Sequence, residues 1–146
     1  MKSYASAHWE GSPKDGTGKL STKSGVLKDS PYSAKARFEG GTSQTTPEEM
    51  IAAAHAGCFT MALGFGLMRA GINQKSIDTE AEVEVEVILG EKGANITGIK
   101  LKTSVVAPGA DAAKIKEAAE GAKANCPISK ALAGVPSITL EIETKV

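Results

Sequence analysis

Two neighbouring segments of the chain alternate between apolar and polar residues. In residues 79–89, valines on one face alternate with glutamates on the other: Val83, Val85 and Val87 against Glu82, Glu84 and Glu86. Residues 96–106 repeat the alternation, with Lys100 and Lys102 at polar positions. Such alternation predicts half-buried strands. Because residues 90–95 carry turn signals, we expect an antiparallel hairpin in which Glu faces Lys.

The N-terminal third is expected to form short strands separated by turns. Residues 3–10, 20–27 and 32–40 are interpreted as strands, and a Gly-rich loop at 11–19 separates the first two. This order predicts an antiparallel meander.

A long helix is expected from Pro47 to about Arg69. Thr46 is a candidate N-cap, Pro47 suits the first helical position, and Glu49 is the capping-box partner. Ala70 and Gly71 end the pattern, so the helix is about 35 Å long.

This helix is apolar all round, which predicts burial on every side. Residues 50–68 contain no charged side chain, and this segment is as long as a membrane span. It is rich in Ala and Gly, however, and includes His55. We therefore expect burial in protein. One sheet covers only one side of so long a helix, so the rest must meet other helices or a second subunit.

The C-terminal third predicts two helices and a strand. Asp111 is a plausible N-cap for a surface helix, whose inward positions are Ile115, Ala118, Ala119 and Ala122. Pro127 marks the start of a short helix, and residues 137–146 form the last strand. The order strands, long helix, hairpin, two helices, strand predicts a single α+β domain over residues 1–146, with antiparallel sheet.

Composition narrows the classes of function. The 146 residues are 41% hydrophobic and 23% charged, and 17 basic residues balance 17 acidic ones. Nothing in this balance indicates nucleic-acid or membrane binding. Because residues 1–20 contain no apolar signal region, we expect a cytoplasmic protein.

Cys126 precedes Pro127, so it is a candidate N-cap, where free backbone N–H groups lower a thiol pKa. Alternatively, it is an inert buried thiol. A metal site built from Cys58, Cys126, His55 and His8 is not favoured, because no close ligand pairs occur.

Cys58 lies mid-helix, where burial raises a thiol pKa and reactivity needs a cation. His55, one turn earlier, is one alternative; Arg37, held by Glu48 or Glu49, is a better one. Glu48 and Cys58 are about 15 Å apart along one helix. Either the helix begins after Glu48, or the acid approaches the thiol of a second subunit.

With these residues assembled, the chain resembles the OsmC/Ohr family of osmotically inducible and organic hydroperoxide resistance proteins, and its OsmC branch in particular. The resemblance runs over nearly all residues, on these segments: AHWEG, STKSGVL, RFEGG, PEEMIAAAHAGCFTMAL, SIDTEAEVEV and NCPISKAL.

The resemblance implies a thiol peroxidase that reduces organic hydroperoxides, and hydrogen peroxide more weakly, without haem or flavin. It implies that Cys58 is the peroxidatic thiol, Cys126 the resolving thiol, and Arg37 with Glu48 the activating pair. It further implies an intertwined homodimer, with sheets wrapped around central helices, and a dihydrolipoyl group as the external dithiol reductant.

Two other functions remain open: a stress-associated binding protein with inert thiols, and a Cys-His hydrolase. For the peroxidase, we expect close helix packing at Ala54, Gly57 and Ala62. An apolar substrate wall is expected from four side chains of the long helix: Phe59, Met61, Phe65 and Met68.

Overall fold

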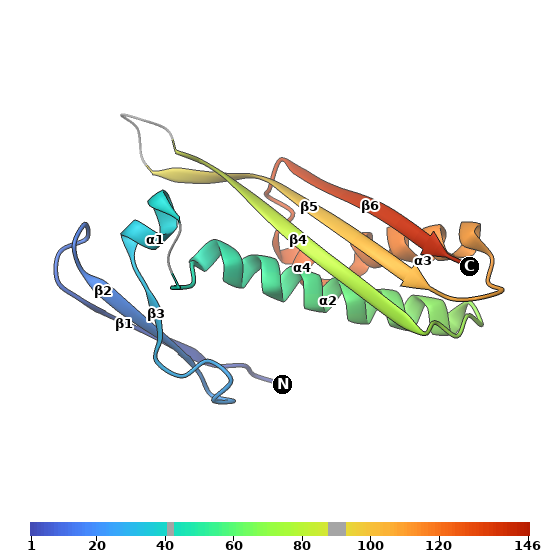
Figure 1. Cartoon of the computed structure of the whole chain (residues 1–146), viewed down its shortest axis with the longest axis horizontal. Helices are drawn as coiled ribbons and strands as arrows, with labels where there is room; N and C mark the ends of the chain where they lie inside the picture. The colour runs from blue at the N-terminus through green and yellow to red at the C-terminus, as the bar shows by residue number, and fades with distance from the viewer. Residues whose placement is uncertain (41–42, 88–92) are drawn as a thin grey trace. The chain divides into compact units, whose positions relative to one another are not determined.

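The computed structural model describes residues 1–40, 43–87 and 93–146. They form two compact units, residues 1–50 and residues 51–146. Both contain a three-stranded sheet, and helices accompany each sheet (Figure 1). The elements therefore have the mixed α+β character that the sequence predicts.

The first unit is built on a small antiparallel meander. Strands β1 (Ala5–Glu10), β2 (Thr17–Thr22) and β3 (Ser30–Tyr32) pair in the order β1-β2-β3. The predicted meander is confirmed, although its second strand ends earlier than expected. Residues 23–29 form turns and bends, and the Thr22 N–H donates a hydrogen bond to the Leu27 carbonyl at 2.9 Å.

The strand expected over residues 32–40 is wrong beyond Tyr32, because a short helix, α1 (Ala34–Glu39), occupies most of this segment. Ser33 caps it, since its hydroxyl accepts the Ala36 N–H at 3.1 Å. Gly40 ends it with a positive φ of 67°, a conformation that glycine adopts without strain. A local serine cap therefore overrides the strand-like pattern.

Helix α2 (Pro47–Arg69) has the predicted bounds and N-terminus. The Thr46 hydroxyl accepts the Glu49 N–H at 3.1 Å, as expected of an N-cap. The Glu49 carboxylate in turn accepts the Thr45 hydroxyl at 3.1 Å. Glu48 therefore lies in the first turn, and the helix continues without interruption past Cys58.

The sheet of the second unit contains the predicted hairpin. Strands β4 (Ser76–Val87) and β5 (Ala94–Val106) pair antiparallel, with Glu82 opposite Lys100. Residues 88–92, which hold part of the expected turn, lie outside the described residues. Strand β6 (Ser137–Lys145) joins parallel to β5, so this sheet is mixed where only antiparallel pairing was expected.

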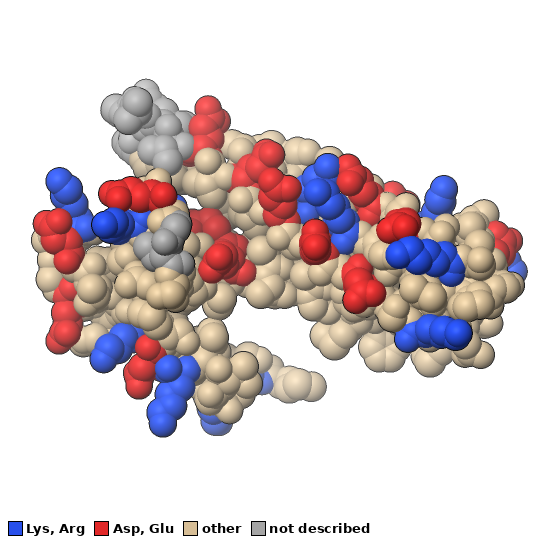
Figure 2. All heavy atoms as spheres, in the orientation of Figure 1, with Lys and Arg blue, Asp and Glu red and all other residues tan. Residues whose placement is uncertain are grey.

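The polar face of this sheet is a mixed-charge surface (Figure 2). Glu82 faces Lys100 across the hairpin, but the Lys100 Nζ forms its ion pair with Glu141 of β6 at 2.5 Å. Glu141 thereby raises the pKa of Lys100. The charge pairing thus spans β5 and β6 rather than the hairpin alone.

Helices α3 (Ala112–Asn125) and α4 (Pro127–Ala131) follow the hairpin, and with α2 they lie along one side of the sheet (Figure 1). Asp111 caps α3 as predicted, because its carboxylate accepts the Ala113 N–H at 2.8 Å. The core beneath the sheet contains ten buried side chains: Phe59, Leu63, Leu67, Ile72, Leu101, Val105, Ala107, Ile115, Ala119 and Ala122.

Helix α2 is buried on one face only. His55, Phe59, Leu63 and Leu67 are buried, as expected of a core helix. By length and composition α2 is apolar enough to cross a membrane, yet this buried face packs against the sheet. The opposite face carries three large apolar side chains with high exposed fractions: Met61 at 65%, Phe65 at 58% and Met68 at 63%.

Candidate active site

Cys58 and Cys126 meet in the second unit. Their sulfur atoms are 2.7 Å apart and joined by a hydrogen bond, although 68 residues separate them in the chain. Both are free thiols; Cys58 is half-buried and Cys126 is fully buried. When a hydrogen-bonded pair of thiols has lost one proton, the two sulfurs share the proton that remains. Only one of the two cysteines is therefore favoured as a thiolate.

The junction of α3 and α4 positions Cys126. This residue ends α3 and precedes α4, and Pro127 occupies the first position of α4 as predicted. The Cys126 side chain makes no capping hydrogen bond, but the free N–H groups of Ile128 and Ser129 in the first turn of α4 act on the Cys126 sulfur. The Ile128 N–H also approaches the sulfur of Cys58. These donors stabilise negative charge on sulfur.

The surroundings of the two thiols differ in their effect on acidity. Burial, followed by the hydrogen bond with Cys126, raises the pKa of Cys58. Burial alone would also raise the pKa of Cys126, but hydrogen bonds from Cys58, Ser129 and Ile128 outweigh it and lower that pKa. Within the second unit, the surroundings therefore favour ionisation of Cys126 over that of Cys58.

His55 does not pair with Cys58. Its Nε2 is hydrogen-bonded to the Ser129 hydroxyl at 2.8 Å. Its Nδ1 is buried and has no hydrogen-bond partner among the described residues. Burial lowers the pKa of this imidazole. The contact that a Cys-His hydrolase requires is therefore not made in the part of the chain that the structure describes.

Arg37 and Glu48 pair within the first unit. The Nε and Nη2 atoms of Arg37 donate to Glu48 Oε1 at 2.8 and 2.6 Å. The guanidinium also lies over the Phe38 ring, with 5.4 Å from Cζ to the ring centroid. Glu49 instead binds Thr45. Geometry therefore distinguishes the two acids that sequence reasoning left open: Glu48 holds Arg37.

The expected substrate wall is divided between two faces of α2. Phe59 is fully buried in the core, out of reach of a substrate, whereas Met61, Phe65 and Met68 are exposed. A Cβ added at Gly57 would meet no atom of the described residues within 4 Å. The close helix packing expected at Gly57 is therefore not made within the described part of one chain.

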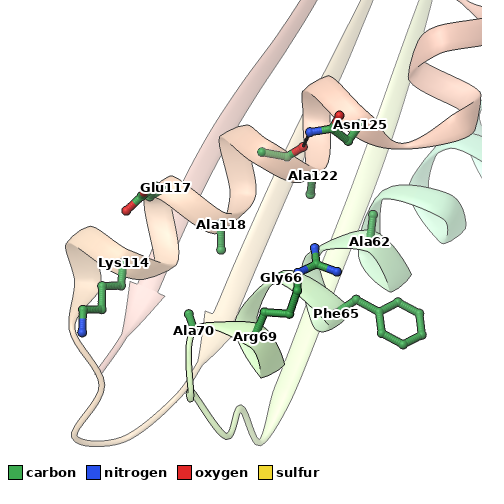
Figure 3. A pocket seen from close by; sticks show the side chains of 11 residues that line it. Ala62, Phe65, Gly66, Arg69, Ala70, Lys114, Glu117, Ala118, Ala122 and Asn125 are labelled. Carbon is green, nitrogen blue, oxygen red and sulfur yellow. Dashed lines mark hydrogen bonds between the residues drawn. The ribbon is translucent and has the colours of Figure 1, made fainter.

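A groove of about 670 Å³ runs between α2 and α3 (Figure 3). Phe65 and Arg69 line it from α2, and Lys114 and Glu117 line it from α3. Neither cysteine is among its lining residues. Among the described residues, no cluster of three His, Cys, Asp or Glu side chains could hold a metal ion.

Ser129 is the residue of this site that sequence reasoning missed. It is buried, its hydroxyl is hydrogen-bonded to His55, and it is among the groups that lower the pKa of Cys126. Its place in the first turn of a helix that begins after Cys126 was the available signal. No sequence signal indicated the contact with His55, which lies 74 residues away in the chain.

Comparison with known proteins identifies the group to which the chain is similar. Residues 40–141 match the family described as OsmC-like protein. The chain is 47% identical to Peroxiredoxin OsmC of Escherichia coli over 139 residues, which cover 95% of this chain and 94% of that protein. It is 30% identical to the organic hydroperoxide resistance protein OhrB of Bacillus subtilis, over 86% and 89% of the two chains.

A solved structure has the same fold. The crystal structure of an organic hydroperoxide resistance protein OsmC from Legionella pneumophila aligns with a TM-score of 0.76 at 24% identity, covering 100% of this chain and 98% of that one. The predicted α+β class and OsmC-like fold are thereby confirmed, and the intertwined homodimer stays a prediction.

Proposed function

Because the chain belongs to the OsmC-like protein family, we propose that it is a cysteine-based peroxidase that reduces organic hydroperoxides to alcohols, and hydrogen peroxide more weakly. The observation that carries this proposal is the 2.7 Å separation of the Cys58 and Cys126 sulfurs. Two thiols this close can be oxidised to a disulfide with little movement. The names of the relatives, a peroxiredoxin and a hydroperoxide resistance protein, support the same chemistry.

The proposed reaction begins at Cys58, the more exposed thiol. Its thiolate attacks the distal oxygen of the hydroperoxide, the O–O bond breaks, and the alkoxide takes a proton and leaves as alcohol. Cys58 is oxidised to the sulfenic acid. Cys126 then attacks the Cys58 sulfur, an S–S bond forms, and the hydroxyl leaves as water. The sum is ROOH plus two thiols giving ROH, water and a disulfide.

In this proposal, Arg37 supplies the cation that Cys58 lacks within its own unit. A guanidinium beside the sulfur stabilises the thiolate and then the charge that develops on the departing oxygen. Glu48 holds the guanidinium through two hydrogen bonds to one carboxylate oxygen. It thereby fixes the orientation of Arg37 before substrate arrives.

The proposal also includes a homodimer. Glu48 and Cys58 lie ten residues apart on the uninterrupted helix α2, which corresponds to about 15 Å along the axis. We therefore assign the Arg37–Glu48 pair at each Cys58 to a second copy of the chain. The exposed apolar side chains Met61, Phe65 and Met68 supply a surface for such a partner.

An external dithiol, of the dihydrolipoyl type, completes the cycle. Its thiolate attacks the disulfide, and its second thiol releases Cys58 and Cys126 in the reduced form. No metal, haem or flavin takes part in the proposed cycle. The proposed compartment is the cytoplasm, where such dithiols are kept reduced.

The test is titration of the reduced protein with cumene hydroperoxide, with free thiols counted and disulfides located by mass spectrometry. We expect both thiols to be lost at one equivalent of peroxide, and dihydrolipoamide to restore them. The Cys126→Ser variant is expected to consume one equivalent and stop at an oxidised Cys58, whereas Cys58→Ser is expected to consume none. Thiols that survive excess peroxide would show that they serve only in packing.

A further inference from the structure

Two buried polar side chains connect the elements that carry the cysteines. His55 lies one turn before Cys58 on α2, and Ser129 lies one turn after Cys126, in α4. The His55 Nε2 is hydrogen-bonded to the Ser129 Oγ at 2.8 Å, and the two residues are 0% and 7% exposed. This bond therefore joins α2 to α4 inside the core, one helical turn from each thiol.

The direction of this hydrogen bond follows from the hydrogens available. A neutral imidazole carries one N–H, and burial keeps His55 neutral by lowering its pKa. If Ser129 donated to Nε2, the imidazole hydrogen would lie on Nδ1, which is buried and has no hydrogen-bond partner among the described residues. Because a buried unpaired N–H is costly and rare, the Nε2–H of His55 is the donor and the Ser129 oxygen is the acceptor.

Helix α4 needs tertiary contacts because it is short. It spans five residues, Pro127–Ala131, and the Cys126 side chain at its start makes no capping hydrogen bond. Helices of this length are unstable by themselves, so packing against other elements decides where they lie. The bond from His55 is a tertiary contact of this kind, and it reaches the first turn of α4, next to Cys126.

The thiol pair is sensitive to the position of α4. A disulfide requires an S–S distance of about 2.05 Å and a narrow range of Cβ separations. The sulfurs of Cys58 and Cys126 lie 2.7 Å apart, so a small movement closes the bond. A displacement of reacting groups by about 1 Å is enough to slow a reaction by about 10²-fold. A contact that fixes α4 on α2 therefore bears directly on disulfide formation.

We propose that His55 and Ser129 are positioning residues for a disulfide between the two cysteines: their hydrogen bond holds the first turn of α4 against α2 and keeps the two sulfurs within bonding reach. The part that this plays in peroxide turnover rests on the proposed function, but its part in disulfide formation does not. Because the hydrogen bond and the disulfide hold the same two elements together, each favours the formation of the other.

The test uses thiol–disulfide exchange with glutathione, in the absence of peroxide. Two protein thiols and one molecule of oxidised glutathione give the protein disulfide and two molecules of reduced glutathione, so two electrons and two protons pass to glutathione. The fraction of protein disulfide is measured at each ratio of reduced to oxidised glutathione, by acid quenching, alkylation and mass spectrometry. These fractions give the equilibrium constant of disulfide formation.

Ser129→Ala is expected to lower this equilibrium constant about tenfold, the full effect of losing one hydrogen bond, which corresponds to a reduction potential about 30 mV less negative. Ser129→Thr keeps the accepting oxygen and is expected to retain most of the wild-type value. His55→Leu should give the same loss as Ser129→Ala, and the double variant should show no further loss.

Thr79→Val is the matched control. It also removes a half-buried hydroxyl that joins α2 to another element of the second unit, because Thr60 donates to Thr79 of β4 at 2.8 Å. We expect it to lower the urea midpoint of unfolding but to leave the disulfide equilibrium unchanged. An equal loss in Thr79→Val, or an equilibrium unchanged by Ser129→Ala and His55→Leu, would overturn the proposal.

A second measurement uses the wild-type chain and is independent of how the variants fold. In ¹⁵N NMR spectra, the imidazole hydrogen of His55 is expected on Nε2, and its exchange with solvent should be slower in the disulfide form than in the dithiol form. A hydrogen on Nδ1, or equal exchange in the two forms, contradicts the proposal.

The proposed function is judged separately, by the titration with cumene hydroperoxide. A wild-type protein that exchanges with glutathione as expected but does not react with peroxide would exclude the peroxidase and leave the positioning role intact. In an active peroxidase, Ser129→Ala should accumulate more Cys58 sulfinic acid at excess peroxide, because slower disulfide formation leaves the sulfenic acid open to a second equivalent.

Discussion

At the scale of single residues, acidity divides the site into two parts. The hydrogen bonds around Cys126 lower its pKa, while burial raises that of Cys58. In the proposed reaction, the second unit therefore favours ionisation of the resolving thiol, Cys126. The peroxidatic thiol of that proposal, Cys58, then depends on Arg37, whose guanidinium Glu48 holds.

Replacing Arg37 tests this dependence. We expect Arg37→Ala to slow the reaction of Cys58 with cumene hydroperoxide by about two to three orders of magnitude, comparable to the loss of one preorganised charge-stabilising donor. Arg37→Lys is expected to recover only part of the rate, because an ammonium cannot reproduce the fork that binds Glu48. Stopped-flow measurement of the single-turnover rate checks both, and an Arg37→Ala rate equal to wild type would remove Arg37 from the mechanism.

His55 predicts a pH dependence of stability. Its folded-state pKa lies below its ordinary value of about 6.5, so the unfolded chain binds more protons as pH falls past that value. Stability is therefore retained above pH 6.5 and lost below it, by at most about 1.4 kcal/mol per pH unit. Urea unfolding at pH 7.5, 6.5 and 5.5 measures the slope. In His55→Gln this part of the slope should vanish; an identical slope in both proteins contradicts the prediction.

At the scale of elements, caps and turns determine where helices begin. Thr46 starts α2, Ser33 starts α1 and Asp111 starts α3, each through a side-chain oxygen that accepts a first-turn N–H. The helix α3 matters for the site because Cys126 directly follows it. Its N-terminal cap contributes to stability at a distance from the thiols.

Asp111→Ala is therefore expected to lower the free energy of unfolding by about 1 kcal/mol, the usual effect of losing an N-cap. Asp111→Asn, which preserves the accepting oxygen, should lose much less. Urea denaturation monitored by circular dichroism compares the three proteins. Equal stability of the Ala and Asn variants would mean that the bond to the Ala113 N–H contributes nothing.

At the scale of the whole molecule, the exposed face of α2 is the feature that a single chain leaves unexplained. Met61, Phe65 and Met68 recur about once per turn along one side of the helix, opposite the buried Phe59, Leu63 and Leu67. Large apolar side chains arranged in this way are expected to be covered by protein. The proposed homodimer covers them with a second copy.

Phe65→Glu is expected to convert the dimer to monomers, because a carboxylate in an apolar interface is strongly unfavourable. Sedimentation equilibrium measures the mass, and the peroxidase rate should fall in parallel, since each Cys58 then loses its partner's Arg37. Lys28→Gln, at an exposed turn position, also lowers the net charge by one and should leave the dimer intact. A wild-type chain that sediments as a 15.0 kDa monomer contradicts the dimer directly.

Much of the fold is predictable from local pattern. The bounds of α2, the alternation of β4 and β5 and the cap of α3 depend on residues close together in sequence, so pattern suffices for them. The helix α1, where a strand was predicted, also has a local cause: the Ser33 cap and the terminal Gly40 outweigh the strand-like pattern of this segment.

For the site, the sequence alone was enough to name the candidate residues: two cysteines in different settings, and an arginine with a nearby acid. It did not determine their partners. Tertiary structure decided that β6 runs parallel to β5, that Glu48 rather than Glu49 holds Arg37, and that His55 binds Ser129 rather than Cys58. The physical reason is that helix caps and strand alternation depend on neighbours a few residues apart, whereas these contacts depend on how distant segments pack around a shared core.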